Sequence, residues 1–453
     1  MREKIHFVSL GCDKNLVDSE VMLGLLREEG FSLTDDETEA DVIVVNTCCF
    51  IGDAKEESIN TLLEMGQLKE TGKCKALIAC GCLAQRYADE IRAEIPEVDA
   101  LVGTTAFDRI VPAIKEALAG KRAEEIRDIN ALPVPKVRRV NTTGGYTSYL
   151  IIAEGCDKHC TYCIIPKIRG DYRSVPMEHL LEEARGLAEA GVSELILVAQ
   201  ETTVYGVDLY GKKCLPELLH KLCEIPGLRW IRILYAYPEE ITDELIETMA
   251  KEEKICHYLD MPIQHASDRI LRRMARRTNQ EELRTIVGKL RAAMPDIALR
   301  TTLITGFPGE TQEDQEELYH FVNEMEFDRL GVFTYSAEEN TPAAEMSDQI
   351  PEEVKAARRD EIMELQQEIA FEAAEAMIGR ELDVLIEGKL PDEDVYLGRT
   401  YKDAPGVDGY IFVDCDHELL SGQFVRARVY EAKDYDLMGV IVEEEENEDE
   451  SAE

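Results

Sequence analysis

Long hydrophobic runs are missing from this sequence, and their absence excludes one class of protein. No stretch of its 453 residues approaches the ~20 apolar residues that a membrane-spanning helix needs. The starting run, MREKIHFVSLGC, contains no long apolar segment of the kind found in secretory signals. We therefore expect a cytoplasmic protein with no membrane partner. Thiols stay reduced in that compartment, so the 13 cysteines indicate metal binding or catalysis rather than disulfides.

Positive charge is also scarce. The chain has 50 Lys and Arg against 92 Asp and Glu, which gives a net charge of −42. Non-specific nucleic-acid binding needs Lys and Arg against phosphates, so this balance disfavours that class of protein. It suits a basic partner, although acidity that serves only solubility is an open alternative. The run GFPGE at 306–310 lacks the Gly-Lys-Ser/Thr ending of a phosphate-binding loop, and the eight histidines show no metal-ligand spacing.

Three closely spaced cysteines stand out among the residues that are present. Cys156, Cys160 and Cys163 have the spacing C-x3-C-x2-C and follow a short apolar run that predicts a buried strand. Three thiolates at this spacing suit three irons of a cubic iron–sulfur cluster. Electron carriers normally ligate all four irons with cysteine, so here one iron would stay open to hold a reactant. The alternatives are half of a zinc site, which needs further ligands, and a redox dithiol, which explains only two cysteines.

Residues 1–130 alternate between predicted strands and helices. The strands are expected at 4–11, 40–47, 74–81 and 98–103, and the helices at 15–29, 54–68, 85–95 and 109–119. Short loops between alternating strands and helices favour an α/β domain with a parallel sheet. Residues 131–144 contain two prolines and a basic cluster, and they predict a linker.

Strand–helix alternation resumes over residues 145–378. Six strands are expected, at 149–154, 194–199, 230–235, 257–261, 297–304 and 329–335, before a long helix at 351–378. Six units predict an open, partial (βα)6 barrel rather than the complete eight-unit form. Residues 379–442 alternate short β-rich runs with Gly, Asp and Pro, and they predict a small antiparallel β-barrel. The like-charge run 443–453 predicts a disordered acidic tail.

A second group of cysteines is dispersed through the first predicted domain. Cys12, Cys48 and Cys82 each follow the end of a predicted strand. Because the carboxyl ends of parallel strands open on one edge of a sheet, these residues can converge there and hold a second cluster. Position alone does not separate Cys48 from Cys49, or Cys82 from Cys80. The structural alternative is that buried cysteines act as small hydrophobic residues, and it suits the remaining ones: Cys74, Cys214, Cys223, Cys256 and Cys415.

The C-x3-C-x2-C run closely resembles the motif of the radical S-adenosylmethionine enzymes. The whole pattern resembles the radical S-adenosylmethionine methylthiotransferases, which replace an unactivated C–H with C–SCH3, and the resemblance covers nearly the whole chain. It implies two [4Fe–4S] clusters, S-adenosyl-L-methionine and a C-terminal barrel similar to the TRAM module. The family's S-x-G-C, N-T-C and G-C-L contexts match Cys12, Cys48 and Cys82. The cysteines at 49 and 80 depart from the usual pattern.

The run Ser9–Glu20, SLGCDKNLVDSE, resembles one branch of that family most closely. That branch modifies the β-carbon of an aspartate on a small-subunit ribosomal protein. The transfer-RNA branch typically carries S-Y-G-C-Q-M-N, and here Leu10, Asp13 and Lys14 replace its Tyr, Gln and Met. Residues 381–442 contain 14 acidic and 6 basic residues, a net charge of −8 that should repel RNA and attract a basic ribosomal protein.

The resemblance also implies partners and cofactor contacts. The implied partners are a basic ribosomal protein as substrate, a reductant protein as electron donor and a sulfur donor, with no RNA binding by the C-terminal barrel. Polar residues at the ends of barrel strands are expected to contact S-adenosylmethionine: Gln200, Glu201, Gln264, Arg300 and Thr302. The alternative for each is that it only caps the next helix. A transfer-RNA methylthiotransferase and an electron carrier or scaffold without radical chemistry remain the alternative functions.

Overall fold

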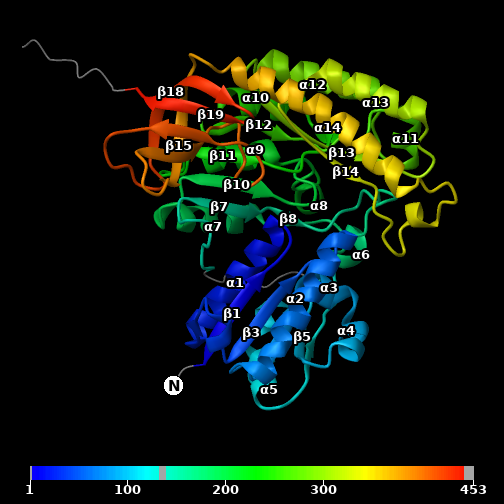
Figure 1. Ribbon diagram of the computed structural model, residues 1–453, viewed down its shortest axis with the longest axis vertical. Coiled ribbons are helices and arrows are strands. Elements are labelled where there is room, and N and C mark those ends of the chain that lie inside the picture. Colours follow the sequence, from blue (N-terminus) through cyan, green and yellow to red (C-terminus); the bar gives the residue numbers. More distant parts are fainter. Residues whose placement is uncertain (1–2, 132–138, 443–453) are drawn as a thin grey trace, which may run out of the picture.

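The computed structural model describes residues 3–131 and 139–442 and contains three main β-structures (Figure 1). Residues 132–138 of the predicted linker and the predicted acidic tail at 443–453 lie outside the described residues. Within the described ranges, no helix is both long and apolar enough to cross a membrane.

The first β-structure is a six-stranded sheet in the order β2-β1-β3-β4-β5-β6, and every pairing is parallel, as predicted. Its strands are β1 (Lys4–Ser9), β2 (Ser32–Leu33), β3 (Val42–Thr47), β4 (Ala76–Cys80), β5 (Val98–Val102) and β6 (Ala123–Glu125). Its helices are α1 (Asp13–Glu29), α2 (Gly52–Thr71), α3 (Gly81–Arg86), α4 (Ala88–Glu94) and α5 (Ile110–Leu118). The central strand β3 is entirely buried, which explains its nearly continuous apolar sequence.

The second sheet has the order β7-β10-β11-β12-β13-β14, again wholly parallel. The strands are β7 (Thr147–Ile151), β10 (Glu194–Val198), β11 (Trp230–Ile233), β12 (Ile255–Asp260), β13 (Ala298–Thr305) and β14 (Arg329–Thr334). The larger helices are α7 (Met177–Glu189), α9 (Leu215–Cys223), α10 (Asp243–Lys251), α12 (Gln280–Ala293), α13 (Gln312–Met325) and α14 (Glu352–Glu375). Since β7 and β14 are the two edges of this order, the (βα)6 barrel is open, which confirms the predicted fold.

One predicted strand of this domain is divided in two. The run expected at 149–154 ends as β7 at Ile151, and a separate strand β8 (Ala153–Glu154) pairs with β9 (Arg173–Ser174) in a two-stranded antiparallel sheet. Residues 155–172, which include the three close cysteines, connect β8 and β9. Two short helices complete the cysteine region, α6 (Ile165–Ile168) and α11 (Asp268–Arg273), and α8 (Val207–Tyr210) follows β10.

The third structure is a closed barrel in the order β15-β16-β17-β19-β18. Its strands are β15 (Glu381–Lys389), β16 (Val395–Arg399), β17 (Ile411–Asp414), β18 (Phe424–Lys433) and β19 (Asp436–Ile441). Four pairings are antiparallel as predicted, but β17 and β19 run parallel. Five strands cannot alternate in direction around a closed ring, so at least one parallel pair is unavoidable.

The C-terminal barrel is fastened to the open barrel through buried charges. Arg399, the last residue of β16, and Arg232 of β11 both donate hydrogen bonds to Glu194 of β10, and all three side chains have an exposed fraction of 0%. Burial raises the pKa of Glu194, but the two guanidinium groups outweigh this and hold it at about 2. The first sheet lies on the other side of the open barrel, next to β8 and α6 (Figure 1).

Candidate active site

The three close cysteines lie on a tightly folded loop. Cys156 and Cys160 are buried and Cys163 is partly buried. Gly155 has a φ of +73°, and a Cβ at this position would lie 2.0 Å from the carbonyl oxygen of Asp171, so only glycine fits here. The Cys156 amide donates to Gly170 O at 3.1 Å, and the Thr161 amide donates to Met274 O at 3.0 Å beside α11. The first hydrogen bond joins the two ends of the loop, and the second attaches its middle to the residue that follows α11.

These three thiols are close enough to influence one another. Burial, with a smaller contribution from neighbouring cysteines, raises the pKa of Cys156 to about 11 and that of Cys163 to about 12. Binding to iron has to displace these protons, because the ligand is the thiolate. Three converging thiols on one loop fit the three cysteine-bound corners of a cubic cluster.

The dispersed cysteines converge at the carboxyl edge of the first sheet. Cys12 is the N-cap residue of α1 and is exposed, Cys48 directly follows β3, and Cys82 lies in the first turn of α3. The strand register pairs Ser9 with Asn46 and Asn46 with Cys80, so the three strand ends are level. This alignment brings residues that are 70 positions apart in sequence, Cys12 and Cys82, to one place.

Asn15 ties the three cysteine turns together. Its Nδ2 donates to Leu10 O and to Thr47 O, both at 3.0 Å, and its Oδ1 lies 3.7 Å from the Sγ of Cys82. Asn15 therefore contacts the turn before Cys12, the turn before Cys48, and Cys82 itself. Its side chain is fully buried, so these hydrogen bonds determine the positions of the cysteines.

The two ambiguous cysteines have different surroundings. Cys80 points into an apolar cluster with Val44 and Ile78, and burial alone raises its pKa. Cys49 is also fully buried, but it lies in the cluster that contains Cys82, and burial raises its pKa to about 12. The structure thus separates Cys80 from the converging group and leaves Cys49 beside it.

Arg169 connects the two cysteine groups. It follows α6, whose Ile168, together with Ile164, packs into the apolar core of the first sheet. The buried guanidinium donates to Asn15 Oδ1 at 2.5 Å, to Asp18 Oδ2 at 2.8 Å and to Glu154 Oε1 at 3.5 Å. Asn15 organises the dispersed cysteines, and Glu154 directly precedes the loop of the close cysteines. The two groups therefore face each other across one domain boundary.

Gln200 and Glu201 lie just past the end of β10, as predicted. Both amide atoms of the Gln200 side chain are buried without a hydrogen-bond partner among the described residues, and so is Oε2 of Glu201. Burial raises the pKa of Glu201 to about 7, and Lys158 lies 3.7 Å from its carboxylate. Buried polar atoms normally have partners, so the unpaired atoms at this rim indicate room for a polar ligand.

Of the other three predicted contacts, Gln264 follows β12, and Arg300 and Thr302 lie on β13. Gln264 has a φ of +70°, an uncommon conformation for a non-glycine residue, and its amide donates to Thr302 O at 2.9 Å. Gln264 and Thr302 are both partly exposed at the same rim. The Arg300 guanidinium is already paired with Asp260 at 2.9 Å and with Asp408 at 3.5 Å. To contact a cofactor, Arg300 would have to give up these partners.

Sequence reasoning missed several charged and aromatic residues beside the close cysteines. Tyr237 OH lies 3.9 Å from Cys160 Sγ, and the guanidinium of Arg276 lies 4.1 Å from the centre of the Tyr237 ring. Nε and Nη1 of Arg276 are buried without a partner among the described residues. These residues come from separate strand-end loops, so no spacing in the sequence connects them to the cysteines.

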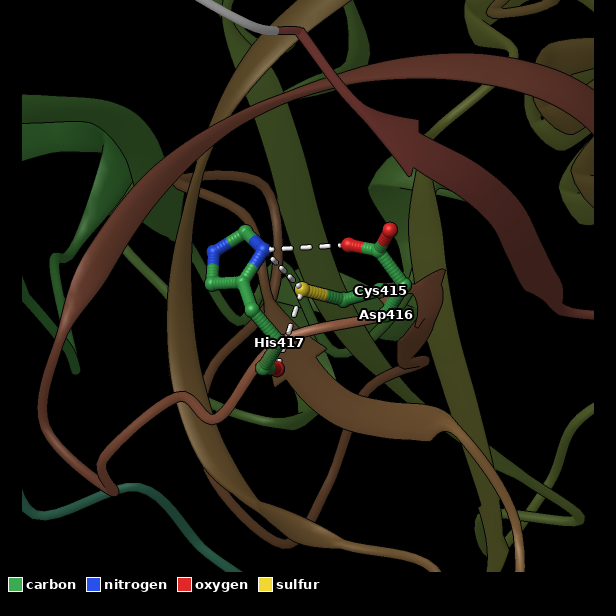
Figure 2. Close-up of side chains that lie close together, drawn as sticks. All are labelled: Cys415, Asp416 and His417. Atoms are coloured by element: carbon green, nitrogen blue, oxygen red, sulfur yellow. Dashed lines mark hydrogen bonds and ion pairs between the residues drawn. The ribbon is translucent and has the colours of Figure 1, made fainter.

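One further group of ligand-type side chains lies on the C-terminal barrel (Figure 2). Cys415 Sγ lies 3.4 Å from His417 Nδ1, and Asp416 Oδ1 lies 3.3 Å from the same nitrogen. The thiol also donates to His417 O at 3.3 Å, and both Asp416 and His417 are solvent-exposed. This turn follows β17 and belongs to a different domain from either cysteine group, so it is separate from the candidate active site.

The three β-structures correspond to three known sequence families. Residues 4–103 match the uncharacterized protein family UPF0004, residues 150–322 match the radical SAM superfamily, and residues 378–442 match the TRAM domain. The dispersed cysteines fall within the first match and the close cysteines within the second.

Curated relatives match over almost the full length. A protein of Lachnoclostridium phytofermentans named "Ribosomal protein uS12 methylthiotransferase RimO" is 68% identical over 96% of this chain and 99% of its own length. Relatives with the same name from Pelotomaculum thermopropionicum and Clostridioides difficile are 52% and 49% identical, each over 97% of this chain and 99% of their own length.

Solved structures share the architecture at low sequence identity. The radical S-adenosylmethionine methyltransferase TsrM from Kitasatospora setae, with cobalamin and a [4Fe–4S] cluster bound, matches with a TM-score of 0.53 at 13% identity, over 84% of this chain and 76% of that one. The cobalamin-dependent radical enzyme OxsB matches with a TM-score of 0.52 at 12% identity, over 80% of this chain and 56% of that one. Likeness at this identity shows the fold alone.

Proposed function

Because this chain belongs to the RimO family of ribosomal protein uS12 methylthiotransferases, we propose that it attaches a methylthio group to the β-carbon of an aspartate on uS12. It is a radical S-adenosylmethionine enzyme, and that superfamily uses S-adenosylmethionine with a [4Fe–4S] cluster. The observation that carries the proposal is the pair of three-cysteine groups that face each other across Asn15 and Arg169. Neither an electron carrier nor a transfer-RNA enzyme is favoured by the names of the relatives.

We assign one cluster to each cysteine group. Cys156, Cys160 and Cys163 are proposed to hold the cluster that binds S-adenosylmethionine, and Cys12, Cys48 and Cys82 a second one. In this division, residues 1–130, 145–378 and 379–442 act as three domains with a linker at 131–144. The separation of Cys80 from the converging group and the convergence on Asn15 support the second assignment.

When bound, these groups supply radical chemistry: the substrate hydrogen leaves with the 5′-deoxyadenosyl part of one S-adenosylmethionine, sulfur comes from a sulfur donor, and the methyl group comes from a second S-adenosylmethionine. The residues of the chain hold the reactants. The polar side chains of Gln200 and Glu201 are proposed to bind the polar groups of S-adenosylmethionine, together with Gln264 after β12 and Thr302 on β13.

The remaining partners follow from this chemistry. Starting the reaction requires a reductant protein, and replacing the consumed sulfur requires a sulfur donor. The net charge of −8 on residues 381–442 supports a basic protein substrate rather than RNA at the C-terminal barrel. A ribosomal substrate places the reaction in the cytoplasm.

The direct test uses the anaerobically reconstituted enzyme with S-adenosylmethionine, reductant and sulfide. Recombinant uS12 and, separately, transfer RNA are offered as substrates, and mass spectrometry detects the replacement of H by SCH3. We expect this gain on an aspartate of uS12. A modified transfer-RNA base without modified uS12 would reject the substrate assignment, and S-adenosylmethionine cleavage without either product would reject the function.

Gly11→Ala tests the position of Cys48. Gly11 has a φ of +90°, and a Cβ there would lie 2.8 Å from the Cys48 Cβ and 3.0 Å from its Sγ. We expect the variant to lose about 1–2 kcal/mol of stability from the backbone conformation and to lose the iron of the N-terminal cluster, because Cys48 is displaced. Iron per chain and the unfolding midpoint are the measurements.

Gly30→Ala is the matched control. Gly11 lies just before helix α1 and Gly30 just after it. Gly30 has a φ of +94°, but nothing lies within 4 Å of a Cβ at that position. We expect a similar loss of stability with no loss of iron. Equal iron contents in the two variants would contradict the placement of Cys48 as a ligand.

A further inference from the structure

The ammonium group of Lys14 lies where the first domain contacts the open barrel. Lys14 is in the first turn of α1, two residues after Cys12. Its Nζ lies 3.0 Å from Asp13 Oδ1, 3.5 Å from the carbonyl oxygen of Ala199, and 3.6 Å from the centre of the Tyr235 ring. Ala199 and Tyr235 follow the ends of β10 and β11. The Lys14 ammonium of the first domain is thus held against the carboxyl ends of these two barrel strands, next to Gln200.

Its surroundings are arranged to keep it there. Tyr235 has a φ of +60°, an uncommon conformation for an aromatic residue, and this backbone geometry places its ring beside the ammonium. Tyr235 OH donates to Asp13 Oδ1 at 3.2 Å, and its amide donates to Asp260 Oδ2 at 3.1 Å. An ammonium has three N–H donors, and Asp13 and Ala199 are its two hydrogen-bond acceptors among the described residues. The Tyr235 ring lies 3.6 Å from the same nitrogen, so a ligand carboxylate competes only with this ring for the third donor.

Other cationic side chains near the boundary between the first domain and the open barrel have different partners. Arg169 is paired with two carboxylates, those of Asp18 and Glu154. Lys158 is close to three, which belong to Glu201, Glu239 and Glu240. Arg276 lies against Tyr237 and Cys160, on the side of the close cysteines.

Lys14, by contrast, has one carboxylate partner and lies beside the exposed Cys12. An anionic side chain that enters beside Cys12 therefore meets an ammonium with a single carboxylate partner. The side chain of Lys14 is only 7% exposed, so a hydrogen bond formed with it is shielded from water.

We propose that Lys14 binds the side-chain carboxylate of the aspartate that is modified. This inference rests on the proposed function. The carboxylate carbon is bonded directly to the β-carbon, so holding the carboxylate at Lys14 holds the reacting C–H between the two cysteine groups. An ammonium also favours a carboxylate over the amide of asparagine, because only the carboxylate carries a charge that strengthens the hydrogen bond. The transfer-RNA branch typically has Met at this position, which cannot pair with an anion.

The experiment compares two ligands with four enzymes. The ligands are uS12 and a uS12 variant with Asn in place of the target aspartate, and their dissociation constants are measured anaerobically with the cluster-loaded, full-length protein. The enzymes are the unchanged (wild-type) enzyme, Lys14→Met, Lys14→Arg and the control Lys75→Met. Lys75 belongs to the same domain, but it is 60% exposed and paired with Asp41.

We expect the unchanged enzyme and Lys75→Met to bind uS12 at least about 30-fold more tightly than the Asn variant. Lys14→Met loses this preference, and Lys14→Arg keeps part of it because the charge remains. The value of kcat/KM for methylthiolation falls with the preference. Iron content checks that the variant is folded, and if Lys14→Met is not folded, Lys14→Gln replaces it.

A Lys14→Met enzyme that still prefers Asp over Asn to the same degree would overturn the inference and leave the proposed function intact. Methylthiolation of uS12 by the unchanged enzyme without any Asp-over-Asn preference in binding would do the same. An unchanged enzyme that neither binds nor modifies uS12 would overturn both.

Discussion

Cys160→Ala is expected to abolish reductive cleavage of S-adenosylmethionine, whereas Cys82→Ala is expected to abolish only the methylthio product. Cys160 belongs to the close group and Cys82 to the dispersed group, and each group has three proposed cluster ligands. Losing one thiolate removes one of these ligands. Each variant should therefore lose about half of the bound iron, because Cys160→Ala loses one cluster and Cys82→Ala loses the other.

The measurements are iron per chain, Mössbauer spectra, 5′-deoxyadenosine formed and modified uS12. Cys74→Ala is the matched control, since Cys74 is equally buried in the first domain and its thiol only donates to Ala76 O. It should keep both clusters and both activities. If Cys82→Ala still modified uS12, the first domain would not hold a catalytic cluster.

Glu194→Gln is expected to lower the free energy of unfolding by about 3–5 kcal/mol, because it leaves the buried guanidinium of Arg232 without its carboxylate and that of Arg399 with Glu387 alone. Arg232 and Arg399 have no exposed surface, and Arg399 comes from the C-terminal barrel. The change therefore weakens the attachment of that barrel to the open barrel.

The single tryptophan, Trp230, reports directly on this contact. Its ring packs edge-on against Phe424 of β18, with a centroid distance of 4.8 Å. We expect the Trp230 fluorescence transition in denaturant to move to a lower concentration in Glu194→Gln. Glu217→Gln, which breaks an exposed pair with Lys221, should change stability by less than about 1 kcal/mol. Equal transitions in the two variants would refute the importance of the buried charges.

The contribution of Glu194 to the free energy of unfolding is expected to decrease at low pH. The pKa of Glu194 is lowered from 4.5 to about 2, so its contribution to stability is complete above pH 4.5 and is lost as the pH falls towards 2. The difference in stability between the unchanged chain and Glu194→Gln should therefore shrink over that interval.

Local patterns were enough to predict much of this protein from its sequence. The alternation of apolar strands and helices predicted both parallel sheets, because a strand buried on two faces must be apolar throughout. The spacing of Cys156, Cys160 and Cys163 predicted one loop with three thiols, because all three lie within eight residues. The very short strands β2, β6, β8 and β9 were not predicted as separate elements, since two or three residues show no periodicity.

The tertiary structure alone decided which charged side chains meet. The contacts of Arg169 with Asn15, of Lys14 with Tyr235 and of Arg399 with Glu194 join residues 154, 221 and 205 positions apart. Each contact needs two domains to pack together, and a polar residue has the same local pattern whether its partner is water or a distant charge. The sequence by itself therefore determined the elements and the cysteine loop, whereas domain packing determined the boundary that makes them one site.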